Sequence, residues 1–477
     1  DYQVHAFTNV YDDHTITAVA DATNQRPQPH GVAANGAAHL IGNKVGTSAA
    51  FGEYGDYLTA SSSTDFDFGS AAFTVEGWYN ITELDLTGDP GFALMGNRRG
   101  SAPYNGWMVA YYSDTMYFYF HNGSNINVNW DWTPKLKRWY HLAFARSGDI
   151  IDFWIDGVSQ GSQAITGTFT ASDGGWKLGG QPNSVNYDFN GYTGPQRIST
   201  AARYTVGSDF TPDTEVWVND SDTKLLIQNG TDGSQTFDDL STGDHTISVT
   251  GGVRWFAPKV GAGAMAFPAY SGADGYYEVT DSQSLDINGN SDWTVEFWLR
   301  RTSTDSASDA IINHALDGGH GWNINWDGSD KVRIYNGNDG AGGVTASTAI
   351  TAHTWTHVAF EYIASSTVLT VYLDGTSDNT STGQVSWTNI NDTLWIGAQD
   401  TGSGATRFFS GGWIDGLRIS RKARYSGNFT PSTTAFTGDI NSALILNAGY
   451  SDGTYNPDIS TGLAISEKSR MDFDGTG

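Results

Sequence analysis

Glu76 and Glu296 are the carboxylates whose surroundings first suggest chemistry. They occupy equivalent positions in two similar runs, residues 73–78 and 293–298. Glycoside hydrolysis requires two carboxylates about 5 to 10 Å apart across a cleft, and a β-strand places such a pair on one face only at even spacing. Neither run supplies a second carboxylate. We therefore interpret both glutamates as structural and predict no catalytic residue and no enzyme activity.

His141 and His357 are the histidines that invite a catalytic or ligand role. Each lies in a Trp-x-His-x-Ala-Phe run, and no Ser or Cys nucleophile motif is near either in the sequence, so we predict two structural histidines. Asp152 and Asp156 also lie at even spacing. The turn formed by an Asp-Gly pair explains Asp156, however, and Thr370 stands in the position of Asp152 in the second copy.

Several tryptophans with polar neighbours are candidates for binding carbohydrate. Sugar rings present apolar faces that stack on aromatic planes, and Asn or Asp beside the ring can bind hydroxyl groups. Trp322 and Trp326 share one face of a predicted strand whose other face carries Asn323 and Asn325. The core of a β-sandwich also contains aromatic residues, so each tryptophan could instead be buried there. The candidates are Trp107, Trp130, Trp132, Trp322 and Trp326.

One oxygen-rich stretch could hold a metal ion. Asp286, Asn288, Asn290 and Asp292 alternate as side-chain oxygen donors, which are the ligands that Ca²⁺ prefers. The Gly and Glu of a helix-loop-helix calcium site are missing, and a turn before the next strand explains the same residues. We expect that no cofactor is required, with Ca²⁺ the one ion that this stretch would accept.

A block of strand-forming residues appears twice and organises the chain. Residues 139–144 and 152–157 form the first copy, and residues 355–360 and 370–375 form the second. Each copy has two runs rich in apolar and aromatic residues and ends in Asp-Gly, a pair typical of two-residue hairpin turns. Further matches keep the same order at a period of about 215 to 220 residues, which suits a whole all-β domain and is too long for a solenoid unit. The pattern predicts two antiparallel β-sandwiches in tandem.

The predicted domains cover residues 1–218 and 219–437, and a partial third repeat covers residues 438–477. In this last stretch, residues 444–447 resemble residues 225–228, which we interpret as opening strands of a further unit. Isolated opening strands leave exposed edges. We therefore expect either that the natural protein continues or that this half-unit pairs with a neighbouring subunit.

Charge and composition exclude several classes of partner. The 477 residues include 25 Lys and Arg against 52 Asp and Glu, which gives a net charge of −27. Such a surface repels phosphate backbones and anionic lipid, so we predict neither nucleic-acid binding nor membrane insertion. The chain has no Cys, and each half is long enough to bury a core without disulfides.

The ordered motifs of both halves resemble a known family. Lys-Val-Gly, Thr-Val-Glu, Trp-x-His-x-Ala-Phe, Asp-Gly, Arg-Ile-Ser, Ala-Arg-Tyr and Phe-Thr-Pro occur in this order twice. The set resembles the laminin G-like branch of the concanavalin A-like lectin/glucanase superfamily. The resemblance implies jelly rolls whose faces or rims often bind glycans or proteins and sometimes calcium. The repeats also resemble those in bacteriophage tail-fibre and other appendage proteins. The first half departs from the second at Gly194 and Pro195, where the second has Asp415 and Gly416.

These observations predict a non-catalytic structural or adhesion protein of a virion or cell-surface appendage. The expected location is extracellular or on the virion surface. The expected partners are glycans or a host surface, and other copies of the chain or appendage proteins in a homo-oligomer. One alternative is a secreted, lectin-like module of a larger adhesin or enzyme. A second alternative is a glucanase-type glycoside hydrolase.

Overall fold

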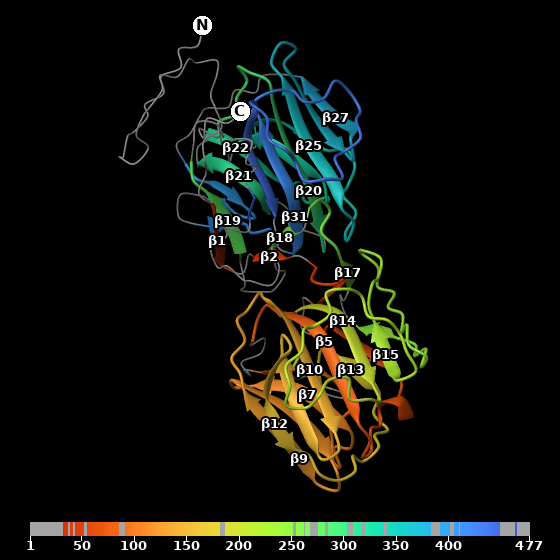
Figure 1. The fold of residues 1–477 in the computed structure, drawn as a ribbon. Coiled ribbons are helices and arrows are strands. Elements are labelled where there is room, and N and C mark those ends of the chain that lie inside the picture. Colours follow the sequence, from red (N-terminus) through yellow and green to blue (C-terminus); the bar gives the residue numbers. More distant parts are fainter. Residues whose placement is uncertain are drawn as a thin grey trace, which may run out of the picture.

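The chain folds almost entirely into β-strands. The computed structural model describes residues 32–36, 39–41, 43–51, 55–84, 91–181, 187–250, 254–261, 263–267, 275–281, 285–302, 309–316, 320–337, 341–382, 392–400, 405–409, 411–448 and 463–464. Figure 1 shows two β-sandwiches stacked end to end. Within the described ranges, one short 3-10 turn, η1 (Thr64–Phe66), accompanies the strands, and no helix is long and apolar enough to cross a membrane. The predicted fold class, tandem antiparallel β-sandwiches, is confirmed.

The first sandwich contains two sheets. Its strands are β3 (Ser48–Phe51), β4 (Tyr57–Ala60), β5 (Phe73–Ile81), β6 (Gly91–Gly96), β7 (Trp107–Tyr112), β8 (Thr115–His121), β9 (Asn125–Asp131), β10 (Trp139–Ser147), β11 (Ile150–Ile155), β12 (Val158–Ala164), β13 (Trp176–Leu178), β14 (Gly191–Ser199), β15 (Thr223–Ile227), β16 (Ser248–Thr250) and β17 (Arg254–Phe256). One sheet has the order β12-β11-β10-β5-β14-β3-β17, with β15 also paired to β14. The other has the order β16-β4-β13-β6-β7-β8-β9.

The second sandwich repeats this plan. Its strands are β1 (Val32–Gly36), β2 (His39–Ile41), β18 (Ala264–Phe267), β19 (Gly275–Val279), β20 (Trp293–Arg301), β21 (Ala310–Leu316), β22 (His320–Trp326), β23 (Val332–Asn336), β24 (Ala341–Thr345), β25 (Thr356–Ile363), β26 (Val368–Leu373), β27 (Thr376–Thr382), β28 (Leu394–Ile396), β31 (Gly412–Ser420) and β32 (Ser442–Ala448). The sheet orders are β2-β18-β31-β20-β25-β26-β27 and β1-β19-β28-β21-β22-β23-β24. β32 pairs with β31 as β15 pairs with β14. Three short strands remain: β29 (Gln399–Asp400), β30 (Ala405–Thr406) and β33 (Leu463–Ala464).

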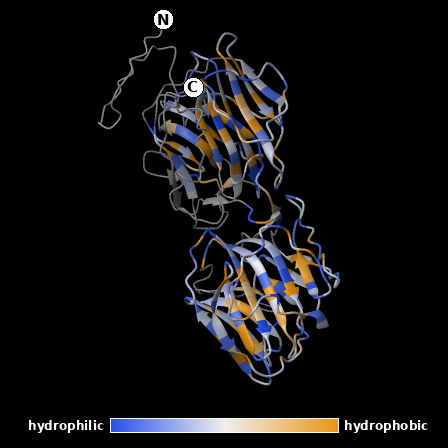
Figure 2. Cartoon of the chain, viewed as in Figure 1, coloured by the Kyte–Doolittle hydropathy of each residue, from blue (hydrophilic) through white to orange (hydrophobic). Residues whose placement is uncertain are grey.

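Alternating hydropathy decides which side of each strand faces the core. In β8, Met116, Phe118 and Phe120 are buried while Tyr117 and Tyr119 are half-buried on the opposite side. Successive side chains of a strand point to opposite faces, so this pattern fixes the register of the sheet. Figure 2 shows hydrophobic and hydrophilic residues interleaved along the strands of both sandwiches.

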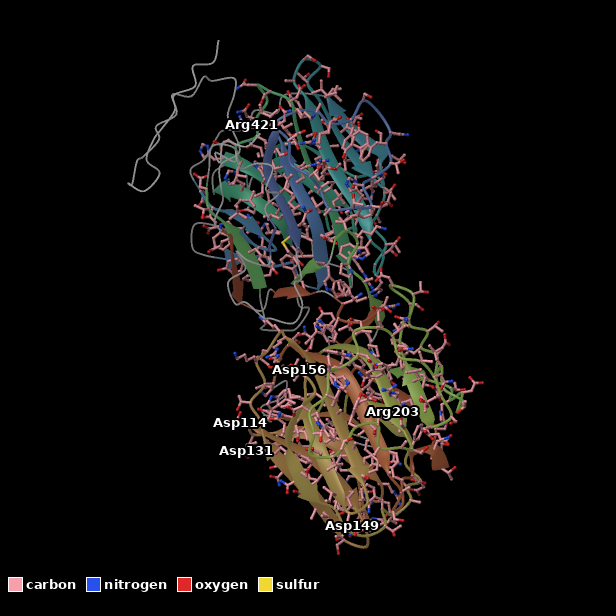
Figure 3. The ribbon with its side chains drawn as sticks, in the orientation of Figure 1. Asp114, Asp131, Asp149, Asp156, Arg203 and Arg421 are labelled. Atoms are coloured by element: carbon pink, nitrogen blue, oxygen red, sulfur yellow. The ribbon has the colours of Figure 1, made fainter. Side chains whose placement is uncertain are left out.

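The Asp-Gly pairs form the hairpin turns that the sequence predicts. Asp156 and Gly157 join β11 to β12 with φ of 52° and 79° (Figure 3), and Asp374 and Gly375 do the same in the second sandwich with 48° and 76°. Two successive positive φ values are the signature of a type I′ turn. The N–H of Phe210 donates to the Gly157 carbonyl at 2.8 Å. The turn therefore docks the distant Phe-Thr-Pro motif, which explains why both motifs recur together.

Replacing Gly157 with alanine is expected to lower the free energy of unfolding by about 2 kcal/mol, because the residue has positive φ and an added Cβ would overlap the carbonyl oxygen of Phe210. Urea denaturation measures the change. Gly148→Ala is the matched control, since Gly148 has φ of 63° but nothing within 4 Å of an added Cβ. Equal losses for the two variants would show that the close contact with Phe210 does not matter.

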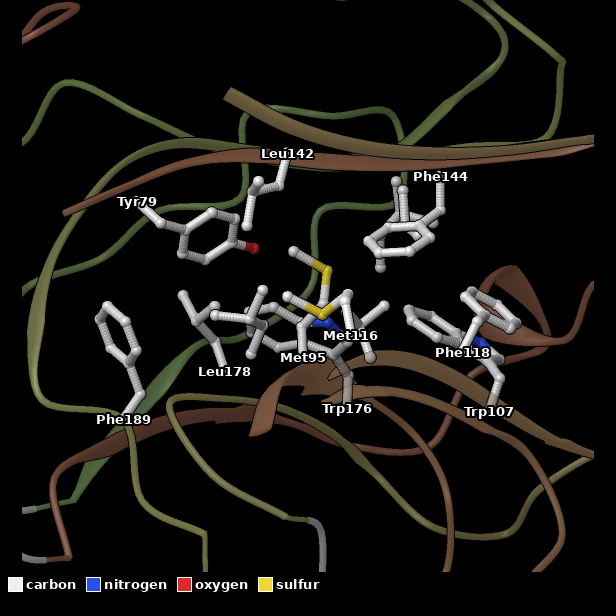
Figure 4. Packing of buried hydrophobic residues seen from close by; sticks show 14 of the residues in the cluster. Tyr79, Met95, Trp107, Met116, Phe118, Leu142, Phe144, Trp176, Leu178 and Phe189 are labelled. Atoms are coloured by element: carbon white, nitrogen blue, oxygen red, sulfur yellow. The ribbon is translucent and has the colours of Figure 1, made fainter. Parts of the chain in front are cut away.

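The two sheets of each sandwich enclose a dense aromatic core. In the first, Tyr79, Met95, Phe118 and Phe144 meet from facing sheets (Figure 4). Each fully buried side chain of this size contributes roughly 1.5 to 3 kcal/mol of transfer free energy. A cavity of ≈ 10 Å³ beside Tyr79 and Leu142 has room for about one water molecule. This cavity is too small for a ligand.

Each sandwich is completed by a strand pair that precedes the other sandwich in the sequence. β16 and β17 come directly before β18, yet they pair with β4 and β3 of the first sandwich. β1 and β2 come directly before β3, yet they pair with β19 and β18 of the second. Each pair covers one edge of both sheets, where unpaired backbone groups would otherwise be exposed. The predicted boundary between residues 218 and 219 falls before β15, β16 and β17, so the sandwich and the sequence repeat end at different residues.

An apolar interface joins the two sandwiches. The Trp413 indole Nε1 donates to the Tyr192 hydroxyl at 3.2 Å, and the Trp355 Nε1 donates to the Ala257 carbonyl at 2.9 Å. The two repeats supply equivalent residues, as in an isologous contact between subunits. The equivalent pairs in this cluster are Val45 and Val260, Trp78 and Trp298, Trp139 and Trp355, and Tyr192 and Trp413.

Candidate functional site

The tryptophans predicted to bind carbohydrate lie in the cores instead. Trp107, Trp322 and Trp326 are at most 1% exposed and Trp130 is 5% exposed. Trp132 is half-buried, with its ring edge-on to those of Tyr111 and Tyr140. These indoles therefore form no exposed stacking platform, and the glycan-platform interpretation is corrected. The physical reason is register: every one of them occupies the inward-facing position of its strand or packs against the core from its edge.

Glu76 lies at the centre of a buried polar cluster. Its carboxylate accepts from the Arg197 guanidinium at 2.6 Å and from the Tyr204 hydroxyl at 2.5 Å, and His141 Nε2 lies 3.2 Å from Oε2. Burial by itself would raise the pKa of Glu76. The hydrogen bonds from His141 and Tyr204 and the charge of Arg197 outweigh burial and lower this pKa to about 2. The carboxylate therefore holds the Ala-Arg-Tyr segment, which contains Tyr204, against the sheet.

Glu296 has the same surroundings in the second sandwich. Arg418 lies 2.6 Å from its carboxylate, His357 Nε2 lies 3.3 Å away, and the Tyr425 hydroxyl donates to Oε2. Burial opposes the ionised form, but these partners lower the pKa of Glu296 as well. These contacts place both glutamates and both histidines in internal hydrogen-bond clusters. Both carboxylates are bound internally and buried, so neither faces an open groove as a glycoside hydrolase would require.

The oxygen-rich stretch before β20 has the hydrogen bonds of a turn. Asn288 Oδ1 accepts from the Asn290 N–H at 2.9 Å, and Asp292 Oδ1 accepts from the Ala364 N–H at 2.8 Å. Asp286 is buried. Across the part of the chain that the structure describes, no three His, Asp or Glu side chains are placed to hold a metal ion. Calcium binding stays a prediction.

One outward face of the first sandwich combines flat aromatic rings with exposed amides. We call it the tyrosine face and define it by Arg98, Tyr117, Tyr119, Asn127 and Asn129. Tyr117 lies directly opposite Asn129 on the neighbouring strand, and Tyr119 lies opposite Asn127. The two tyrosine rings stack with centroids 5.2 Å apart and an angle of 21° between their planes. Both asparagines are exposed, and both rings are half-buried, so the face offers aromatic planes beside exposed amides. The two amides contact each other, since Asn129 Nδ2 donates to Asn127 Oδ1 at 3.4 Å.

The tyrosine face has an apolar floor and two different ends. Met108 and Ala110 of β7 lie beside Tyr119 and Tyr117 in the sheet. The Arg98 guanidinium lies 5.2 Å from the ring centre of Tyr119 and 5.0 Å from that of Tyr104. At the other end, Asp114 occupies the turn between β7 and β8, and Asp131 lies opposite Thr115 where β9 ends (Figure 3). The face is therefore cationic at one end and anionic at the other.

The equivalent face of the second sandwich keeps the tyrosine and the guanidinium. Tyr335 of β23 lies opposite Asn323, as Tyr119 lies opposite Met108, and the Arg333 guanidinium lies 4.8 Å from the Tyr335 ring centre. The Tyr335 hydroxyl accepts from the side-chain amide of Asn325 at 2.7 Å and from that of Asn323 at 3.2 Å. This face is more polar than the first, and its ring is covered, because Tyr335 is 5% exposed and both asparagines are fully buried. The two repeats thus carry different residues at the same position of the fold.

A sequence signal for the tyrosine face existed. Tyr117 and Tyr119 alternate with the core residues of β8, so the period-2 rule that buries Phe118 also turns the tyrosines outward. Tyrosine tolerates that partly wet position because its hydroxyl stays hydrated. No sequence pattern predicted the contact between Arg98 and Tyr119. Arg98 lies in the segment between β6 and β7, outside any strand, and reaches Tyr119 only in the folded structure.

The fold and these faces define a class of protein: tandem jelly-roll β-sandwiches with an aromatic and polar sheet face in each unit. Residues 51–205 and 271–427 match the family described as the concanavalin A-like lectin/glucanases superfamily. The chain belongs to this family. No curated protein sequence matches it.

Comparison with solved structures finds matches at low sequence identity. Domains LG4-5 of the mouse laminin α1 chain are 12% identical, with 82% of this chain and 95% of that chain covered and a TM-score of 0.28. A putative carbohydrate-binding protein from Bacteroides ovatus is 13% identical, with 44% and 60% covered and a TM-score of 0.32. The carbohydrate-binding module CBM66 from Bacillus subtilis is 18% identical, with 32% and 93% covered and a TM-score of 0.20.

Proposed function

We propose that the chain is a non-catalytic glycan-binding module that uses the tyrosine face to hold sugar rings. The observation that carries the proposal is the stacked, half-exposed pair Tyr117 and Tyr119 beside the exposed amides of Asn127 and Asn129. Apolar faces of sugar rings stack on aromatic planes, and amides bind hydroxyl pairs. The lectin and glucanase family to which the chain belongs supports this role.

The proposed setting is extracellular adhesion. The chain would serve as a subunit of a virion or cell-surface appendage, with other copies of itself and a host-surface glycan as partners. The runner-up is a secreted, lectin-like module of a larger adhesin or enzyme. Ca²⁺ bound by the stretch around Asp286 to Asp292 is the one ion that we propose as an addition to glycan binding.

Binding to a glycan array by the full chain tests the proposal. The double variant Tyr117→Ala with Tyr119→Ala is expected to lose about tenfold or more in affinity for every glycan that the unaltered chain binds, because both stacking planes are removed. Ile150→Ala is the control, since Ile150 is 46% exposed on the opposite sheet. Equal binding by the double variant and the control would contradict the proposal, as would release of reducing sugar from β-glucans.

A further inference from the structure

Most of the fourteen arginines that the structure describes are matched with carboxylates. Nine of them form ion pairs, with Arg99 and Asp173 at 3.2 Å and Arg203 and Asp220 at 2.8 Å as examples. Such matching is expected where 52 acidic residues accompany 25 basic ones. The paired arginines are Arg99, Arg138, Arg146, Arg197, Arg203, Arg300, Arg301, Arg418 and Arg424.

Arg98 and Arg333 are two of the remaining five, and they lie beside equivalent tyrosines in the two folds. Among the described residues, neither forms an ion pair with a carboxylate. Arg98 contacts the rings of Tyr104 and Tyr119, and its Nε is buried without a hydrogen-bond partner. Arg333 contacts the ring of Tyr335, and its Nε donates to Asn325 Oδ1 at 2.7 Å.

The two guanidinium groups reach equivalent tyrosines by different routes. Arg333 is two residues from Tyr335 on the same strand, whereas Arg98 follows β6 and approaches Tyr119 from the far side of β7. A guanidinium offers a fixed fork of donors that fits a carboxylate, and it stays charged at neutral pH.

Resting on the proposed function, we propose that the tyrosine face binds an acidic saccharide whose carboxylate pairs with Arg98. On the tyrosine face the sugar rings then lie over Tyr119 and Tyr117. The carboxylate points away from Asp114 and Asp131 at the opposite end, so the face fixes the direction of the bound chain. The net charge of −27 opposes any anion at long range, but screening shortens this repulsion to about 8 Å at physiological salt.

Calorimetric titration of the full chain in 0.15 M salt tests the inference with two matched probes, tetragalacturonate and its methyl ester. The ester has the same rings without the charge. We expect the acid to bind about tenfold tighter than the ester, and Arg98→Gln to abolish that preference by weakening binding of the acid more than binding of the ester. Arg99→Gln is the matched control, because the neighbouring Arg99 is already paired with Asp173.

The possible results separate the two proposals. Equal binding of acid and ester by the unaltered chain would overturn the acidic-sugar inference and leave glycan binding standing. Failure of both probes and of every glycan on the array would overturn the proposed function itself. Binding of a sulfated carrageenan tetrasaccharide in preference to tetragalacturonate would show that the anion is sulfate and would also overturn the carboxylate assignment.

Discussion

Replacing Glu76 with glutamine is expected to lower the free energy of unfolding of the first sandwich by about 3 to 5 kcal/mol at pH 7. The variant leaves the Arg197 guanidinium, whose side chain is 7% exposed, without its carboxylate, and removing one member of a buried ion pair has this cost. The Tyr204 hydroxyl also loses the acceptor that holds the Ala-Arg-Tyr segment. Guanidinium chloride denaturation followed by tryptophan fluorescence measures the loss.

The pH dependence of the same variant gives a second measurement. The pKa of Glu76 is lowered from its ordinary value of 4.5 to about 2, so its contribution is fully present above about pH 4.5 and disappears as the pH falls towards 2. The difference between the unaltered chain and Glu76→Gln should therefore shrink over that window. Asp149→Asn is the control, because the Asp149 side chain is 73% exposed and its pair with Arg146 should contribute little. A loss below about 1 kcal/mol for Glu76→Gln would contradict the structural role of the cluster.

Replacing Asp415 with asparagine is expected to stabilise the second sandwich at pH 8. Asp415 Oδ2 accepts from the N–H groups of Lys259 and Val260, both at 2.8 Å, while its buried Oδ1 has no hydrogen-bond partner. Burial raises the pKa of Asp415 to about 7, although these N–H groups and that of Gly416 oppose the shift. At pH 8 the folded protein must therefore hold a buried negative charge, which asparagine would remove while its oxygen keeps the two acceptor bonds.

The coupling between proton binding and folding gives the direction in which stability changes with pH. Between pH 3.8, the ordinary pKa of Asp, and pH 7 the folded state keeps a proton that the unfolded state releases, so the stability contributed by Asp415 falls as the pH rises through this window. Ionisation of Asp415 costs up to about 4 kcal/mol in the free energy of unfolding at high pH, and asparagine removes this cost. The unpaired amide hydrogens of asparagine offset about 1 to 3 kcal/mol of the resulting stabilisation. We expect Asp415→Asn to be about 1 to 3 kcal/mol more stable than the unaltered chain at pH 8 and no more stable at pH 5.

Thermal unfolding of both proteins between pH 5 and 9 checks this expectation. Asp173→Asn is the control, since the Asp173 side chain is 72% exposed. Because Lys259 and Val260 belong to the segment that crosses from β17 to β18, the same residues connect the two sandwiches. An Asp415→Asn variant whose stability falls with pH as steeply as that of the unaltered chain would show that Asp415 is ionised throughout.

The sequence by itself determined the fold class. Period-2 alternation, Asp-Gly turns and the internal repeat can each be recognised in the sequence without knowledge of the tertiary structure. They also placed Trp322 and Trp326 on one face with Asn323 and Asn325 on the other, as observed in β22. The absence of a second carboxylate at even spacing from Glu76 is likewise visible in the sequence, because that spacing lies within one strand.

Only the tertiary structure decided which aromatic residues are covered where both faces of a strand carry them, and which strands complete which sandwich. Both faces of β7 and β8 carry aromatic residues, so composition pointed to Trp107 as readily as to Tyr119, and sheet-on-sheet packing buried the former and exposed the latter. Strand pairing is likewise non-local. The residues of β16 and β17 do not by themselves specify which sandwich these strands join. They pair with β4 and β3 of the first sandwich, where they cover edges whose unpaired backbone groups would be costly.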